Sequence, residues 1–226
     1  DWTLPAAQTD ESDEMIAWTS AIPRDVVETI GDAHVDYPEG FTMHPKIKKL
    51  YEKRQQMSRE GNIDWGFGEL LAFGSILMEG APIRMSGEDA RRATFVQRHA
   101  VAHDFNTGEE WTPLEFLSDK QGKFMIYDSS LSEYAPMGFE YGYSVERPEA
   151  LTIWEAQFGD FSFGGQTMID EFICSAQQKW HQHSSLVLLL PHGFEGQGPD
   201  HSSARIERWL SLAAQDNMWT VSYTHL

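Results

Sequence analysis

The stretch LVLLLPHGFEGQGPDHS, residues 186–202, is the part of the sequence that decides the fold. It begins with five consecutive apolar residues, Leu186 to Leu190, and lacks the alternation of a strand with one face in water. Such a run is typical of a parallel strand that is buried on both faces. Three glycines and two prolines then fix a tight backbone, and a helix is expected behind it at Ser202–Gln215. The segment therefore predicts a strand, a loop and a helix of an α/β protein.

The same order of strand and helix occurs twice more, earlier in the chain. Phe124–Tyr127 is a short apolar run followed by a helical pattern at Leu131–Tyr143, and Leu151–Trp154 is followed by one at Phe161–Ala176. A further strand is expected at Pro82–Met85. The repetition predicts the fold class as α/β, a doubly wound and mostly parallel sheet with helices on both faces.

Residues 1–60 precede this pattern and do not share it. Two short helices are expected there, at Asp25–Ile30 and Pro45–Arg59, so we interpret this part as a partly helical arm or linker from an upstream domain. The α/β domain is predicted at 61–218, and residues 219–226 form an atypical tail. The chain starts with Asp and not Met, which suggests a fragment or a processed product.

The beginning of the α/β domain combines a clear signal with an unclear one. Asp64 is a residue type that caps helices, and the helix behind it is expected to stop at Gly80. After the strand, Ser86–Ser118 shows no clean periodicity and contains a turn at Asn106-Thr107-Gly108. It is predicted to be a long loop, and long ordered loops in compact domains are often functional.

Composition excludes several classes of function. The formal net charge of -18 argues against a nucleic-acid surface, which needs clustered Lys and Arg. No apolar run approaches the roughly 18 residues that span a bilayer, and the acidic N-terminus is no signal peptide. Cys174 is the single cysteine, so no disulfide framework or thiolate cluster is expected and a cytoplasmic location is the simplest interpretation. Its place in a predicted apolar helix makes it an inert packing residue.

Three polar, glycine-containing or aromatic segments follow the best strand candidates: Asp128–Glu133, Glu155–Phe161 and Pro191–His201. In an open parallel sheet, ligands bind beyond the carboxyl ends of the strands. The three segments are therefore expected to meet in one crevice.

Each candidate side chain in these segments has a structural explanation beside a functional one. Glu133 opens a helix, where the dipole favours an acid, or it is a carboxyl group suited to proton chemistry. Phe158 and Phe161 are core residues, or a flat shelf for a heterocyclic ring. His201 is a hydrogen-bonded loop histidine or a site residue, and Asp200 or Ser202 caps the following helix.

A metal site and the common nucleophile motifs find little support. Histidines and a glutamate gather near the C-terminus, but no pair lies at an i, i+4 spacing on a predicted helix, so zinc is not expected. The sequence contains no G-x-S-x-G elbow, P-loop or G-x-G-x-x-G motif. The residues of the rejected cluster are His181, His183, His192, Glu195 and His201.

Several short motifs between about Pro38 and Met218 occur together in one known family: Asp64-Trp65-Gly66, Arg84-Met85-Ser86-Gly87-Glu88-Asp89, Arg91-Arg92-Ala93-Thr94-Phe95, Gln97-Arg98-His99-Ala100, Asp128 to Glu133, Phe139 to Tyr143, Trp154 to Phe161, and Leu190 to Arg208. They resemble the pyrimidine-binding, transketolase-like domain of the first component of 2-oxoglutarate dehydrogenase, which depends on thiamine diphosphate. Leu131 to Gly138 is similar to the actinobacterial branch, in which the polypeptide also carries an acyltransferase-like domain.

The resemblance implies a role for each matched position. Glu133 would hydrogen-bond the aminopyrimidine ring of thiamine diphosphate and so promote loss of the C2 proton of its thiazolium. Phe161, or else Phe158, would stack on the pyrimidine, Leu131 would lie under the bent cofactor, and Gln157 would belong to the same cofactor-binding segment. His201 is implied as catalytic and substrate-binding, and His192 as substrate-binding.

The resemblance also implies what lies outside the chain. The diphosphate- and Mg²⁺-binding motif of the family, Gly-Asp-Gly followed by Asn, is absent here and belongs to a separate upstream domain. We therefore expect a homodimer that completes the site, a second acyltransferase component or fused domain, a small 2-oxo acid substrate, and no activity of this chain alone. Alternatives are a non-catalytic pairing domain of the same fold and a related enzyme, such as a 2-oxoadipate dehydrogenase, a pyruvate-specific decarboxylase or a transketolase.

Overall fold

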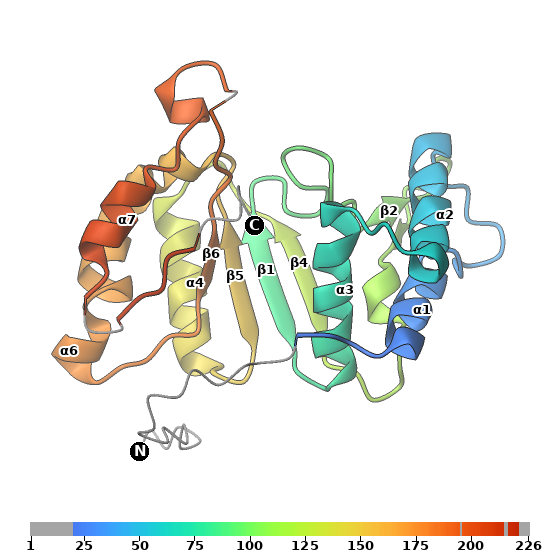
Figure 1. The fold of residues 1–226 in the computed structure, drawn as a ribbon, viewed down its shortest axis with the longest axis horizontal. Helices are drawn as coiled ribbons and strands as arrows, with labels where there is room; N and C mark the ends of the chain where they lie inside the picture. The colour runs from blue at the N-terminus through green and yellow to red at the C-terminus, as the bar shows by residue number, and fades with distance from the viewer. Residues whose placement is uncertain (1–19, 195, 215–216, 222–226) are drawn as a thin grey trace.

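The structure is a computed structural model and describes residues 20–221 except 195, 215 and 216. Its centre is a four-stranded sheet in the order β4-β1-β5-β6 (Figure 1). Every neighbouring pair is parallel, and Gly87 at the end of β1 lies beside both Asp128 and Glu155. The strands therefore end at one edge, and the predicted α/β fold is confirmed. The strands are β1 (Ile83–Gly87), β4 (Phe124–Asp128), β5 (Leu151–Glu155) and β6 (Val187–Leu189).

Helices cover both faces of the sheet because side chains alternate along each strand. Ile153 of β5 packs in the same core cluster as Phe67 of α3 (Trp65–Met78). The next residue, Trp154, packs instead with Met137 of α4 (Tyr134–Glu146). In Figure 1, α4 and α7 accordingly lie toward the left of the sheet and α3 toward the right.

The two N-terminal helices share the core of the α/β domain. They are α1 (Arg24–Ala33) and α2 (Pro45–Glu60), which lie beside α3 at the right of Figure 1. Ile30 and Met57 are buried in the same cluster as the apolar face of α3. Asp64 accepts a hydrogen bond from Phe67 N at 3.0 Å and so caps α3 as expected. The domain boundary at residue 60 stays a prediction, although α1 and α2 pack against α3 in one common core.

The strand that decides the fold is less buried than expected. β6 was predicted to be buried on both faces, yet it is an edge strand among the described residues and Val187 is 37% exposed. Leu188 and Leu189 are only partly buried. The apolar run thus predicts the strand correctly and its burial on both faces wrongly, because the neighbours of a strand are set by tertiary structure.

The predicted helix Phe161–Ala176 is wrong as one element. The chain there forms a 3-10 helix η2 (Gly159–Gly165), a single turn α5 (Gln166–Met168), a π-helix η3 (Ile169–Ile173) and a short α6 (Ala176–Trp180). Gly164 and Gly165 near its beginning explain the break, since glycine is a poor former of regular helices.

The two other predicted helices begin later than expected. The helix predicted at Leu131 begins as α4 at Tyr134. In the C-terminal segment, Pro199–His201 forms a 3-10 turn, η4. The helix α7 (Ile206–Leu212) starts directly after Arg205, whose backbone is in the left-handed conformation. Neither Asp200 nor Ser202 therefore caps this helix, and Gln215 lies outside the described residues.

The segment predicted as a long loop contains a small hairpin. β1 continues to Gly87, and after a loop β2 (Ala102–His103) pairs antiparallel with β3 (Glu110–Trp111). The turn between them is held by Asp104, whose carboxylate accepts the N–H of Asn106 and of Thr107. A 3-10 turn, η1 (Pro113–Glu115), follows the hairpin.

His34, at the C-terminal end of α1, is a fully buried titratable group. Its ring packs edge-on to Tyr51 and Phe67, with centroid distances of 5.0 and 5.8 Å, and Nδ1 lies 2.8 Å from Ile30 O. Nε2 is buried and has no hydrogen-bond partner among the described residues. Burial, and then the charge of Arg54, lowers the pKa of His34 to about 3.

This burial predicts a pH-dependent loss of stability. Because the pKa of His34 is lower in the folded than in the unfolded state, its contribution is present above pH 6.5 and is lost as pH falls from 6.5 toward 3. Urea unfolding between pH 6 and 4.5 should show that wild type loses up to about 1.4 kcal/mol more per pH unit than His34→Gln. Parallel stability curves for the two proteins would contradict a neutral, buried His34.

Candidate functional site

A small acidic pocket lies at the carboxyl edge of the sheet. Its walls come from the residues that end or follow three strands, so the parallel register itself brings them together. The lining residues are Glu88 after β1, Ser129, Ser130, Ser132 and Glu133 after β4, and Trp154, Glu155 and Gln157 at and after the end of β5.

Glu133 stands at the N-cap position of α4, but within the described chain its side chain makes no capping hydrogen bond. Its carboxylate instead lies against η2. A Cβ atom added to Gly164 would be only 2.8 Å from Glu133 Oε2, so a larger residue there would displace the carboxylate from its present position. Glu133 thus stands where the helix dipole favours an acid without capping the helix, and its carboxylate is one wall of the acidic pocket.

Glu88 is a second carboxyl group in this pocket, and sequence reasoning assigns it no role. Burial, followed by the charges of Asp89 and Glu133, raises its pKa, while a hydrogen bond from Gln157 opposes the rise. Gln157, expected at the site, is thus bonded to an acid within it. The signal that would have identified Glu88 is its position directly after β1.

Four rings form an aromatic cluster beside the pocket: Phe95, Phe158, Phe161 and His201. Phe158 is central, with centroid distances of 4.6 Å to His201, 5.3 Å to Phe161 and 5.8 Å to Phe95. Phe161 also meets His201 edge-on at 5.3 Å. The histidine therefore packs on two aromatic rings that come from the segment after β5.

The 3-10 helix η2 joins the acidic pocket to the aromatic cluster. Gly164 near its end touches Glu133, and Phe161 near its beginning touches His201. The structure thus brings the three segments after β4, β5 and β6 to one edge, as the sequence predicts. Leu131 lies between β4 and α4 with its side chain 77% exposed.

The loops after β5 and β6 are tied to one another. Arg205 Nε donates to both carboxylate oxygens of the buried Asp160 at 2.9 Å, and Gly193 N donates to Ser202 O at 2.8 Å. His192 belongs to the same loop, but its Nδ1 accepts a hydrogen bond from Ala204 N at 2.8 Å and its ring packs on Phe194. This geometry gives His192 a place in holding the loop.

The loop after β1 is held in a strained form by buried arginines. Ala93, Val96 and His99 have φ values of 67°, 55° and 39°, in the left-handed region that costs a residue other than glycine on the order of 1–3 kcal/mol. Arg98 is fully buried and donates to both carboxylate oxygens of Glu155, at 2.7 and 2.8 Å. Its guanidinium also bonds Glu69 on α3 and the carbonyl of Ala90.

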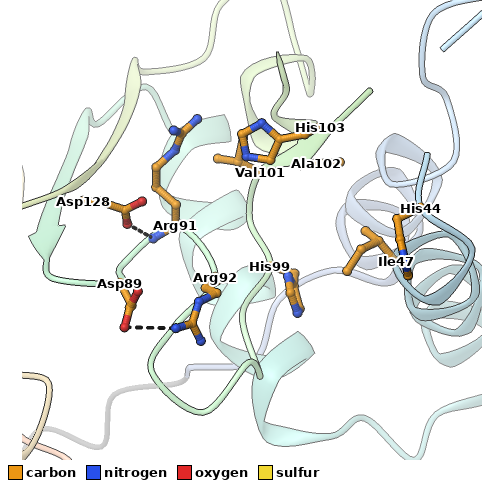
Figure 2. Close-up of a pocket in the computed structure, with 10 residues that line it drawn as sticks. All are labelled: His44, Ile47, Asp89, Arg91, Arg92, His99, Val101, Ala102, His103 and Asp128. Atoms are coloured by element: carbon orange, nitrogen blue, oxygen red, sulfur yellow. Dashed lines mark hydrogen bonds and ion pairs between the residues drawn. The ribbon is translucent and has the colours of Figure 1, made fainter. Parts of the chain in front are cut away.

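A larger cavity of about 270 Å³ lies on the other side of this loop and was not predicted. Figure 2 shows Arg91 and Arg92 on one side of it and, on the other, His44, the N-cap residue of α2, and Ile47. Arg91 pairs with Glu110 and Arg92 with Asp89, so both cations already face a carboxylate. The pocket is formed by segments far apart in the sequence, which is why no motif indicates it.

Within the described residues, no group of three or more His, Cys, Asp or Glu side chains could hold a metal ion. Glu195, from the rejected zinc cluster, lies outside them. Cys174 packs partly buried beside the α4 core, and burial, then Asp170, raises its pKa to about 11. It is therefore a poor nucleophile near neutral pH. No helix in this part of the chain is long and apolar enough to cross a membrane.

The fold and the site define an α/β domain with an acid and an aromatic shelf at its ligand-binding edge. Such an edge suits a flat polar ring. The family model described as the pyrimidine binding domain of transketolase matches residues 61–224. The chain belongs to this family of transketolase-like pyrimidine-binding domains.

Curated relatives extend this comparison. The chain is 54% identical over 216 residues to the multifunctional 2-oxoglutarate metabolism enzyme of Mycobacterium sp. (strain JLS). It is 56% identical over 216 residues to the protein of the same name from Mycolicibacterium vanbaalenii. Each alignment covers 92% of this chain but only 17% of the relative, so the chain spans about a sixth of the proteins it matches.

The close approach of Gly164 to Glu133 predicts the effect of a single methyl group. Gly164→Ala should displace the Glu133 carboxylate at a cost of about 1 kcal/mol, the low end for overpacking, because the atom that the added Cβ meets is the end of a flexible side chain. Gly142→Ala on α4 is the matched control, since its Cβ meets no atom within 4 Å, and it should stabilise by about 0.5–1 kcal/mol.

Urea denaturation measures both effects, and a double variant identifies the contact. Glu133→Ala should recover most of the loss in the Gly164→Ala background. Failure of this rescue would mean that Gly164 is needed for another reason.

Proposed function

We propose that this chain supplies the aminopyrimidine-binding half of a thiamine diphosphate site in a 2-oxoglutarate dehydrogenase or decarboxylase. Its family and the name shared by its relatives support this function. The observation that carries it is the position of Glu133, whose carboxylate caps no helix and faces a pocket beside an aromatic cluster.

The described residues supply the chemical groups that a pyrimidine ring needs. Such a ring needs a carboxyl group for a ring nitrogen and an apolar surface for its face, and both lie along η2. Trp154 also lines this pocket, and its indole N–H is buried without a hydrogen-bond partner among the described residues. A buried donor without an acceptor is uncommon and marks a place where a further polar group belongs.

Each residue then has a defined task. Glu133 would hydrogen-bond the pyrimidine nitrogen, and Phe161 would stack on the ring, because Phe158 is already enclosed by three other rings. Leu131 is exposed and free to lie under the cofactor, and Gln157 would hold Glu88 in place. Thiamine diphosphate, when bound, supplies the carbon nucleophile and electron sink for decarboxylation of a 2-oxo acid.

His201 would face the substrate. Its ring is held by Phe158 and Phe161 at the end of the loop after β6, so it is positioned without being buried. An imidazole with a reference pKa of about 6.5 can donate or accept a proton near neutral pH. His192 would act on the substrate only indirectly, by fixing the loop that carries His201.

Residues outside this chain would complete the enzyme. Binding of the diphosphate through Mg²⁺ and transfer to an acyltransferase would fall to the five-sixths of the relatives that the chain does not match, and pairing into a homodimer would complete the site. A cytoplasmic location is part of the same proposal. The alternative is a non-catalytic pairing domain. The presence of both Glu133 and His201 at the carboxyl edge of the sheet favours an active site instead.

Glu133→Gln tests the proposal most directly within the complete enzyme. The amide cannot exchange a proton with the pyrimidine nitrogen, so turnover with 2-oxoglutarate should fall on the order of 100- to 10,000-fold. Steady-state kinetics measure this, with Glu146→Gln, an exposed acid on the same helix, as the matched control. Turnover near the wild-type value in Glu133→Gln would refute the assignment.

His201→Ala separates a substrate role from a packing role. Turnover should fall by about 100-fold or more, while affinity for thiamine diphosphate changes little, because the ring faces the substrate side. Calorimetry gives the affinity and thermal melting gives the stability of the same variant. Normal turnover with a lowered melting temperature would make His201 a purely structural member of the aromatic cluster.

A further inference from the structure

The loop after β1 reaches the site at two points. At its beginning, Glu88 lines the acidic pocket that contains Glu133. Further along, the ring of Phe95 meets Phe158 edge-on at a centroid distance of 5.8 Å. Phe95 is 54% exposed, so burial of its own ring does little to hold it there. Contacts of other residues must therefore keep the loop in this position.

Two buried arginines hold the loop at both ends. Arg98 Nη1 donates to Ala90 O at 2.8 Å, which joins the beginning of the loop to its end. Arg54 of α2 donates to Gln97 O at 3.1 Å and also to the carbonyl of Arg98. Both guanidinium groups are buried, with at most 1% of the residue exposed. These contacts stabilise the left-handed conformations at Ala93, Val96 and His99.

The carboxylate partners of Arg98 anchor this arrangement to the rigid part of the fold. Glu155 is the last residue of β5, and it receives both of its hydrogen bonds from the Arg98 guanidinium. Glu69 on α3 accepts from Arg98 Nη2 at 3.0 Å and from Nε. The guanidinium therefore connects a helix, a strand end and a strained loop. We call Arg98, Glu69 and Glu155 the clamp.

We propose that the clamp is a positioning device for the proposed cofactor site. It holds the loop so that Phe95 supports the ring of Phe158, and Phe158 in turn orients Phe161, the ring proposed to stack on the cofactor, and His201. Arg98 is a positioning residue, since it acts through the loop and Phe95. The inference rests on the proposed function only for the identity of the ligand. The mechanical coupling from Arg98 to Phe95 stands on the contacts themselves.

A double-mutant cycle in the complete enzyme tests this coupling. Glu69→Gln weakens the clamp but leaves Arg98 with Glu155 and Ala90, so a folded protein is expected. Glu69→Gln and Phe95→Ala should each weaken binding of thiamine diphosphate about tenfold. The double variant should be weakened about tenfold as well, because both changes release the same ring. A combined loss of about 100-fold would overturn the proposal.

Glu140→Gln is the matched control. Glu140 accepts two hydrogen bonds from Arg84, at 2.7 and 2.9 Å, and is 2% exposed, so it is a buried Arg–Glu pair on the α4 side of the sheet. It should lower the melting temperature as the clamp variant does. In a double variant with Phe95→Ala, the two fold-changes in cofactor affinity should multiply, because the two sites are independent. If Phe95→Ala and Glu140→Gln were as non-additive in cofactor binding as Phe95→Ala and Glu69→Gln, the cause would be a general loosening of the protein, and the proposal would be overturned.

Limited trypsin digestion gives a readout that needs no ligand. Arg91 and Arg92 lie within the loop, and the Arg92 side chain is 45% exposed. Glu69→Gln should speed cleavage after Arg92 by about tenfold relative to Glu140→Gln, because only the first releases the loop. Equal cleavage rates would overturn the proposal. A wild-type enzyme that binds no thiamine diphosphate would overturn the proposed function instead, and the cleavage rates would still decide the clamp.

Discussion

The ion pairs of Arg98 with Glu69 and Glu155 are the constraint on which the site depends. A buried guanidinium needs compensating charge, since breaking such a pair by removing one partner typically costs about 3–5 kcal/mol. Here the compensation comes from α3 and from the last residue of β5. The strand end, the helix and the loop after β1 can therefore change position only together. The carboxyl edge of the sheet gains a rigid wall as a result.

The site itself combines this wall with segments that approach closely through glycine. A Cβ atom on Gly87 would lie 2.5 Å from Glu155 O, and one on Gly164 would lie 2.8 Å from the Glu133 carboxylate. Close backbone approach at these two points allows the acidic pocket to be narrow. The ion pair of Arg205 with Asp160 then ties the loops after β5 and β6, so that His201 meets the aromatic rings. The rigid strand ends and the connected loops thus place Glu133 beside the aromatic cluster.

Much of this arrangement could be predicted from sequence, because strand and helix order depends on local patterns. The three strand–loop–helix units and the convergence of their loops follow from apolar runs and the parallel rule. The resemblance added roles for Glu133 and His201 that spacing alone left open. The edge position of Leu186–Leu190 could not be predicted, since it depends on which strands pair. Glu88, Phe95 and the Arg98 clamp were missed because their partners lie far away in the sequence.

The central claim is that Glu133 and the aromatic cluster receive a pyrimidine ring at the carboxyl edge of this sheet. A crystal structure of the complete enzyme with thiamine diphosphate tests it directly. The account predicts a Glu133 carboxylate oxygen within about 2.6–3.2 Å of a pyrimidine nitrogen, with Phe161 or Phe158 against the ring face. A pyrimidine bound elsewhere, with Glu133 and His201 facing only protein or solvent, would contradict it.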